Sequence, residues 1–128
     1  MKIDLCLPYP PSMNTYWRNF RGIMVLSKQG REYKNEVKTM VIEEKIPQFG
    51  DRRLAVKMTL RPRDKRQIDL DNRIKAVLDA LQNAGVFTDD WQVDFLQIER
   101  GEPVRHGAIY VTIESIDEVP TNAPVSAL

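Results

Sequence analysis

The sequence predicts a single α/β (α+β) domain, with a mixed four-stranded sheet and two main helices in the order β-α-β-α-β-β. Two segments alternate apolar with polar residues, as half-buried strands do, and two longer segments repeat apolar residues at the spacing of one helical face. Proline and glycine lie between these segments and mark their ends. The chain has 128 residues, 42% of them hydrophobic and 29% charged, which is typical of one globular domain.

The first half of the chain predicts a strand, a loop and a helix. Apolar residues alternate at 3–7, and the prolines that follow end this strand. Residues 12–26 predict a loop, with room for a short strand at 23–26. Ser27 can cap the N-terminus of a helix that continues to about Lys45, after which proline and glycine break the chain.

The second half predicts a strand, a helix and two further strands. Strict alternation at 53–61 predicts a strand with one buried face. The segment 71–84 has an apolar helical stripe and is followed by Gly85, a favoured residue at a helix end. Residues 95–100 and 108–114 predict two strands joined by a loop that contains glycine and proline.

We expect a domain over residues 1–117 and a loose tail at 118–128, where two prolines interrupt a segment without periodicity. Cys6 is the only cysteine and His106 the only histidine, so an internal disulfide, a histidine-based zinc site and a catalytic triad are not expected. No segment is apolar enough to span a membrane, and the N-terminus lacks the apolar core of a signal peptide. A protein of the reducing cytoplasm is therefore expected.

Acidic residues at the start of the second predicted helix are the most informative feature. Asp69 and Asp71 lie six and four residues before Lys75, so Asp71 is one helical turn from it, and the pair Asp89 and Asp90 follows after a helix-length interval. Closely spaced carboxylates need a compensating cation, and Mg²⁺ binds through carboxylates while keeping waters for a phosphate substrate. The plain structural alternatives are an N-cap at either acid of the first pair, an i,i+4 ion pair with Lys75, and an ordinary acidic loop.

The metal cluster requires a tight return of the chain. The helix at 71–84 would be about 20 Å long at about 1.5 Å per residue. Residues 85–90 could also cover about 20 Å if they were fully extended. Asp90 can therefore reach Asp71 only if the chain doubles back almost directly or if the helix is shorter.

Basic residues gather just before the acidic motif. The stretch from Arg52 to Lys75 contains nine basic and three acidic residues, a local charge of +6, although the net charge of the chain is +1. Such asymmetry directs a polyanion to one face, and a solvated, charge-rich strand end is the plain alternative. The candidate phosphate-binding residues are Arg61, Arg63, Lys65 and Arg66. Acids beside a basic run predict a metal-dependent nuclease.

Several motifs occur in a fixed order from Leu7 to about Glu114. They are Pro10-Pro11-Ser12-x-Asn14-x-Tyr16-Trp17-Arg18, Ser27 with Gly30, Asp69-Leu70-Asp71-Asn72, Lys75, Ala84-Gly85, Asp89-Asp90 and Gln92-Val93. This order resembles the RusA family of Holliday junction resolvases. The resemblance implies a small homodimeric endonuclease of bacteria or their prophages. Such an enzyme requires Mg²⁺, or Mn²⁺ in its place, and cuts branched DNA at four-way junctions.

The resemblance also implies the roles of the site residues. The catalytic metal ligands would be Asp69, Asp71 and Asp90, with Asp89 as a weaker candidate, and Lys75 would be the catalytic lysine. The metal would activate a water for attack on the phosphodiester, and the lysine would stabilise the developing charge or orient the water. Other acids, such as Asp79 and Asp94, are expected to lie outside the site.

Arg18, beside two aromatic residues, is a further candidate for a DNA contact. Where the family often has an unbroken arginine run before the first catalytic aspartate, this chain has Gln67 and Ile68. That departure bears on DNA affinity and sequence preference.

Two alternatives stay open: a metal nuclease that acts on flaps, forks or simple duplexes, and a non-enzymatic DNA-binding dimer whose acids are structural.

Overall fold

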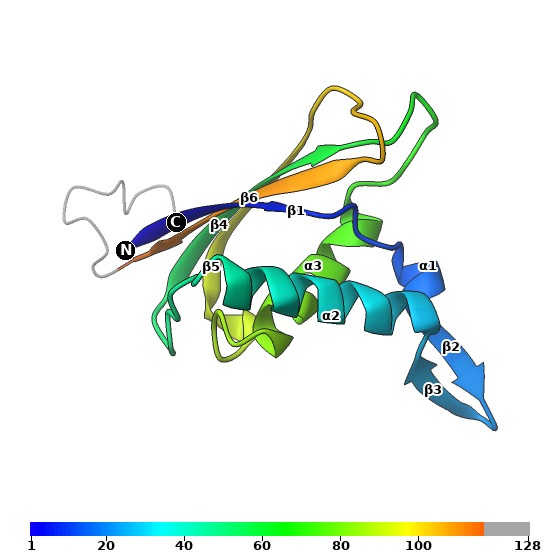
Figure 1. The fold of residues 1–128 in the computed structure, drawn as a ribbon, viewed down its shortest axis with the longest axis horizontal. Helices are drawn as coiled ribbons and strands as arrows, with labels where there is room; N and C mark the ends of the chain where they lie inside the picture. The colour runs from blue at the N-terminus through cyan, green and yellow to red at the C-terminus, as the bar shows by residue number, and fades with distance from the viewer. Residues whose placement is uncertain (117–128) are drawn as a thin grey trace, which may run out of the picture.

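A computed structural model of the protein describes residues 1–116, which form a four-stranded sheet with two long helices against one face (Figure 1). The spatial order of the strands is β1-β6-β4-β5. The strands are β1 (Lys2–Leu7), β4 (Leu54–Arg61), β5 (Val93–Arg100) and β6 (Ala108–Ser115). The helices are α2 (Lys28–Glu43) and α3 (Asp71–Asn83). The predicted fold class and element order are confirmed, and the predicted tail at 118–128 lies outside the described residues.

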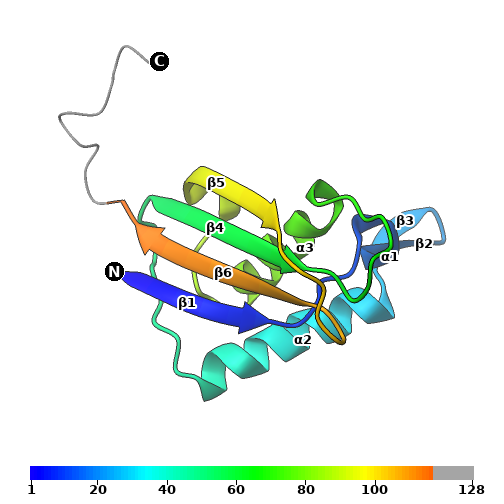
Figure 2. The ribbon, with the colours of Figure 1, turned by 90° about the horizontal axis from the view of Figure 1, so that it is seen from above.

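The sheet is mixed because α3 lies between two of its strands in the chain. β4 and β5 pair in parallel, whereas β6 pairs antiparallel with both β1 and β4. Parallel neighbours need a long crossover connection, and α3 provides it across one face of the sheet. Figure 2 shows α2 on the β1 side and α3 on the β4–β5 side. The loop at 62–70 leads from the end of β4 to the acidic motif at the start of α3.

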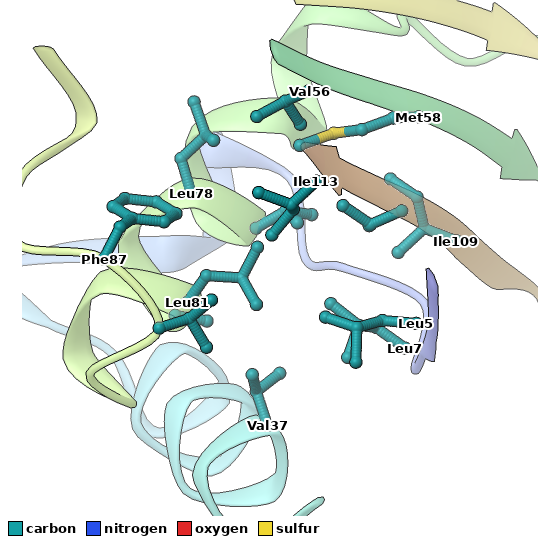
Figure 3. Packing of buried hydrophobic residues seen from close by; sticks show 14 of the residues in the cluster. Leu5, Leu7, Val37, Val56, Met58, Leu78, Leu81, Phe87, Ile109 and Ile113 are labelled. Atoms are coloured by element: carbon teal, nitrogen blue, oxygen red, sulfur yellow. The ribbon is translucent and has the colours of Figure 1, made fainter. Parts of the chain in front are cut away.

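The core lies between this face of the sheet and the two helices. Along β4 every second side chain is buried, which confirms the strand predicted from strict alternation. Figure 3 shows Val56 and Met58 of β4 facing Leu78 and Leu81 of α3. Val37 of α2 belongs to the same buried cluster. Each buried side chain of this size contributes about 1.5–3 kcal/mol relative to its exposed state. This packing fixes the helix that carries the acidic residues.

The prediction of a loop at 12–26 is wrong, except for its short strand. The structure has α1 (Met13–Tyr16) and a hairpin of β2 (Trp17–Phe20) and β3 (Ile23–Leu26). The hairpin turns through Arg21 and Gly22, which have φ angles of 53° and 80°. Two consecutive residues with positive φ form the two-residue turn that suits the twist of paired strands.

The ends of the long helices follow their predicted signals. The Ser27 hydroxyl accepts a hydrogen bond from the Gly30 N–H at 3.0 Å and so caps α2. Gly85, with φ of 82°, follows α3, and the Val86 N–H donates to the Leu81 carbonyl at 3.0 Å. Within residues 1–116, no helix has both the length and the apolar character needed to cross a membrane.

Candidate active site

The first acidic pair lies at the N-terminus of α3. Asp69 and Asp71 are both exposed, on either side of Leu70, which occupies the cap position and makes no side-chain capping bond. The alternative in which one of these acids serves as the N-cap is therefore not the observed arrangement. The preceding loop is held by Arg100, whose Nη2 donates to the Ile68 carbonyl at 2.8 Å. Both carboxylates face solvent where the helix dipole favours negative charge.

Lys75 lies one turn further along α3, between two carboxylates. Its Nζ donates to Oδ2 of Asp90 and lies 3.4 Å from Oδ1 of Asp79. The hydrogen bond to Asp90 is the main cause that raises the pKa of Lys75, and the same bond lowers the pKa of Asp90. The lysine therefore stays protonated, and the aspartate ionised, across the neutral range.

The contacts of Lys75 differ from the sequence analysis in two respects. Its i,i+4 ion pair is with Asp79, one turn towards the C-terminus, and not with Asp71. Asp79 was expected to lie outside the site, yet its side chain is only 20% exposed and contacts the lysine. Asp94 does lie apart from Lys75, because its carboxylate pairs with Arg53.

The chain doubles back after α3, as the predicted cluster requires. The Phe49 N–H donates to the Val86 carbonyl at 2.8 Å, and the Thr88 N–H donates to the Gly50 carbonyl at 3.2 Å. These bonds tie the returning segment to the loop before β4. Asp90 then begins the short 3₁₀ helix η1 (Asp90–Gln92) and reaches the second turn of α3 at Lys75.

Gln92 holds this return in place, and sequence reasoning gave it no role of its own. Its side chain is fully buried. Its Oε1 accepts from the N–H groups of Thr88 at 2.9 Å and Asp89 at 2.7 Å. Its Nε2 donates to the carbonyls of Gly50 at 2.8 Å and Arg52 at 2.7 Å. Four hydrogen bonds from one buried amide fix the segment that presents Asp90.

Asp89, the weaker candidate ligand, has a local structural task. Its carboxylate accepts from the Trp91 N–H at 3.3 Å and caps η1, while the Asp89 N–H donates to the Gln92 side chain. This is a capping box, and the spacing Asp-x-x-Gln is its sequence signal. The same spacing could have identified Gln92 as a structural residue.

The donor set suits a hard divalent cation, because Asp69, Asp71 and Asp90 offer only carboxylate oxygens. Across residues 1–116, however, no three acidic, histidine or cysteine side chains come close enough together to hold a metal ion. The cation that lies against Asp90 in this arrangement is the ammonium group of Lys75. The predicted metal ligands therefore have suitable chemistry, and their role stays a prediction.

The predicted DNA-binding residues lie in different parts of the fold. Arg61 is engaged by the loop between β5 and β6, where its Nε donates to the Glu102 carbonyl at 2.9 Å. Lys65 and Arg66 are exposed in the loop between β4 and α3. Arg66 pairs with Asp64 at 2.7 Å, which lowers the pKa of that carboxyl to about 2.

Arg63 and Arg73 form a basic pair around Tyr9. Their guanidinium carbons lie 5.1 Å and 4.6 Å from the centroid of the Tyr9 ring, within cation–π range. Arg73 also donates to the Pro10 carbonyl at 2.6 Å. A Cβ at Gly107 would lie 2.5 Å from Cδ1 of Tyr9, so glycine is required beside this ring.

A pocket of about 220 Å³ opens between this pair and the Lys65 loop. Its lining includes Arg63, Arg66 and Arg73. It also includes Gln67 and Ile68, which stand where the family often has arginines. Sequence reasoning did not single out Arg73, although it lies two residues after Asp71 and within the basic stretch. The pocket brings three guanidinium groups together, and two of its lining residues, Ile68 and Arg73, flank the first acidic pair in the chain.

Arg18 lies away from this pocket, on the exposed β2–β3 hairpin, where its guanidinium carbon is 5.3 Å from the centroid of Phe20. The structure thus brings Lys75 and Asp90 together and places Asp69 and Asp71 at the adjacent end of α3.

Comparison with known proteins identifies the family. Residues 8–114 match the family described as "Endodeoxyribonuclease RusA". The chain is 37% identical over 113 residues to a crossover junction endodeoxyribonuclease of Enterobacteria phage HK97, covering 88% of this chain and 94% of that protein. It is 35% identical over 114 residues to the enzyme of that name from Shigella sonnei strain Ss046 and 34% identical over 114 residues to that from Escherichia coli strain K12. Those two matches each cover 86% of this chain and 92% of the relative. The chain therefore belongs to the RusA endodeoxyribonuclease family.

Proposed function

We propose that this protein is a metal-dependent endodeoxyribonuclease that resolves four-way DNA junctions. The relatives that match most of its length are named crossover junction endodeoxyribonucleases. The observation that carries the proposal is the position of Lys75, a lysine held by Asp90 one turn from two exposed aspartates at a helix N-terminus. A protonated lysine beside several carboxylates suits the hydrolysis of a phosphodiester, because both positive charge and anionic ligands are needed there.

The proposed ligands of a divalent cation are Asp69, Asp71 and Asp90. Bound Mg²⁺, or Mn²⁺ in its place, would supply Lewis acidity and an activated water. In the reaction, the water oxygen bonds to phosphorus, the bond to the leaving oxygen breaks, and that oxygen takes up a proton. Lys75 is placed to donate hydrogen bonds to a phosphate oxygen, where negative charge develops. Asp79 keeps the ammonium group on this side of α3.

The DNA backbone is proposed to cross the pocket beside the first acidic pair. Arg63, Arg66 and Arg73 line it, and Lys65 lies exposed next to it. Arg61 supports this surface from the sheet side, because its guanidinium is held by carbonyls of the loop between β5 and β6. Contacts of this kind bind phosphates without reading sequence and become weaker as salt rises.

Resolution of a junction requires two cuts in strands related by symmetry. We propose that a homodimer supplies them, because a two-fold dimer presents matching sites to matching strands. The relatives are proteins of bacteria and of phages that infect them. The proposed place of action is therefore the bacterial cytoplasm, in recombination and repair of DNA.

The test is incubation of the protein with a synthetic immobile four-way junction and with a linear duplex of the same sequence, each with and without Mg²⁺. Paired symmetric cuts in the junction alone, and only with metal, are expected. Equal cutting of the duplex would favour a nuclease with another substrate. Binding without any cutting would favour the non-enzymatic DNA-binding dimer.

A further inference from the structure

The β2–β3 hairpin, residues 17–26, projects from the body of the protein beyond α1 (Figure 1). Its strands pair over four residues each, from Trp17 opposite Leu26 to Phe20 opposite Ile23. Alternation along the strands places Phe20 and Ile23 on one face and Trp17 and Met24 on the other. An isolated two-stranded ribbon is marginally stable, so this one depends on what holds its root and what contacts its tip.

The root of the hairpin is firmly fixed. The Ser27 N–H donates to the Tyr16 carbonyl at 2.8 Å, which closes the base of the ribbon. A Cβ on Gly30 would lie 2.8 Å from that carbonyl oxygen and 2.9 Å from the Leu26 side chain, so the first turn of α2 packs tightly here. Tyr16 itself is fully buried. The direction in which the ribbon projects is therefore set by the core.

The tip, in contrast, exposes apolar surface. Ile23 is 66% exposed, Met24 60% and Phe20 47%. Arg18 and Arg21 place their guanidinium carbons 5.3 Å and 5.2 Å from the centroid of the Phe20 ring. An aromatic ring flanked by two arginines, with an isoleucine opposite it, is an apolar tip with a positive rim.

The charge of the hairpin favours a polyanion as its partner. Residues 17–26 include two arginines and no acidic residue. If the tips of two copies met about a two-fold axis, four arginines would gather with no acid in either hairpin to compensate them. Phosphates on either side of a base would compensate the same charges, while the ring stacks on the base.

The root also lies close to the proposed cutting site. α1 packs against α3, and Tyr16, the last residue of α1, is near enough to Asp79 for that carboxylate to raise its pKa, after the larger effect of burial. Asp79 in turn contacts Lys75. A strand whose phosphate lies at Lys75 would therefore pass the base of the hairpin.

We propose that the β2–β3 hairpin is a wedge that contacts bases exposed at the branch point of DNA, with Phe20 and Ile23 as the stacking residues. This inference rests on the proposed function, because only branched or distorted DNA presents unstacked base faces next to a cutting site. Apolar side chains that enter between base steps are an established means of holding distorted DNA. Arg18 and Arg21 would bind the flanking phosphates.

The test uses the full chain and a junction with 2-aminopurine at its branch point, in buffer without Mg²⁺ so that no cutting occurs. Phe20→Ala and Ile23→Ala are compared with wild type and with Ile42→Ala. Ile42 is the matched control, because it is 65% exposed on α2, far along the chain from the hairpin. Junction affinity, affinity for a linear duplex, 2-aminopurine fluorescence and sedimentation are measured for each protein.

Wild type is expected to prefer the junction and to change the 2-aminopurine fluorescence. Phe20→Ala and Ile23→Ala should each weaken junction binding by about tenfold, with duplex binding within about twofold, because one stacked base is lost. They should also lose the fluorescence change, whereas Ile42→Ala should behave as wild type.

Wild-type affinity of both hairpin variants for the junction would overturn the wedge while leaving the proposed function intact. An equal loss of affinity for junction and duplex would overturn the wedge too. Hairpin variants that sediment as monomers, when wild type is a dimer, would also overturn it, because the hairpin would then join two copies of the chain. A wild-type protein that does not distinguish junction from duplex would overturn both the wedge and the proposed function.

Discussion

Replacing Gln92 by methionine should destabilise the protein and displace Asp90. Methionine has nearly the same length and volume as glutamine, so the change removes the amide without leaving a cavity. The N–H of Thr88 keeps the Gly50 carbonyl as an acceptor at 3.2 Å. The N–H of Asp89 and the carbonyl of Arg52 lose the partner that Gln92 supplies. At about 1–3 kcal/mol for each of these two groups left unpaired, the free energy of unfolding should fall by about 2–6 kcal/mol.

Urea denaturation measures this change, with Gln97→Met as the matched control. Gln97 is exposed on β5, so its replacement should alter the free energy of unfolding by less than about 0.5 kcal/mol. Under conditions where Gln92→Met is still folded, junction cleavage should fall more than junction binding, because Asp90 is no longer held at Lys75. Equal stability of Gln92→Met and Gln97→Met, or cleavage by Gln92→Met at the wild-type rate, would show that the Gln92 amide does not hold Asp90 in place.

Three further predictions concern charged groups. Asp79→Asn should lower the rate of junction cleavage by about tenfold without changing junction affinity, because one charge-assisted bond to Lys75 is removed. In a Lys75→Gln background the same change should have no further effect. A further loss of rate in that background would show that Asp79 does not act through Lys75. Arg63→Ala with Arg73→Ala should reduce the log–log salt dependence of junction binding by about 0.9 for each phosphate that the protein no longer neutralises, and an unchanged slope would exclude these residues from the interface. The carboxyl of Asp64 should titrate at about pH 2 by NMR. Its ion pair with Arg66 is therefore fully present above its usual pKa of 3.8 and is lost as pH falls through about 2, whereas Arg66→Ala should return the midpoint towards 3.8.

The elements with one buried face could be predicted from the sequence. In β4 strict alternation follows from a sheet with helices on one side only, and in α3 the apolar stripe follows from contact with that sheet. Such patterns are local in sequence because each residue's burial is set by its own element. The ends of the helices could be predicted for the same reason, since Ser27 and Gly85 act on their nearest turns.

The segment 12–26 could not be predicted as readily, because its structure depends on distant contacts. Tyr16 is buried only because α2 and α3 both pack against α1. Without that packing the surrounding residues lack a helical or strand period long enough to recognise. The Arg21-Gly22 pair, between Trp17–Phe20 and the apolar run Ile23–Leu26, was the one local signal of a turn, and it indicates a hairpin.

The candidate site shows the same division. Its residues could be proposed from their order in the chain, but their partners could not. Lys75 has acids at both i−4 and i+4, and only the returning segment with Asp90 decides that it lies towards Asp79. Gln92 appears in the sequence as an ordinary polar residue, and its importance comes from the four backbone groups that the fold brings around it.

Cleavage of a four-way junction by Asp71→Asn in Mg²⁺, measured beside wild type, tests most directly whether the acidic residues around Lys75 form the active site. The substitution keeps the shape of an exposed side chain and removes one proposed anionic ligand, so the protein should fold normally and bind the junction at least as tightly without metal. Wild type is expected to make paired cuts, and the variant is expected to bind the junction without cutting it. A variant that cuts at near the wild-type rate would show that the acids around Lys75 are not the active site.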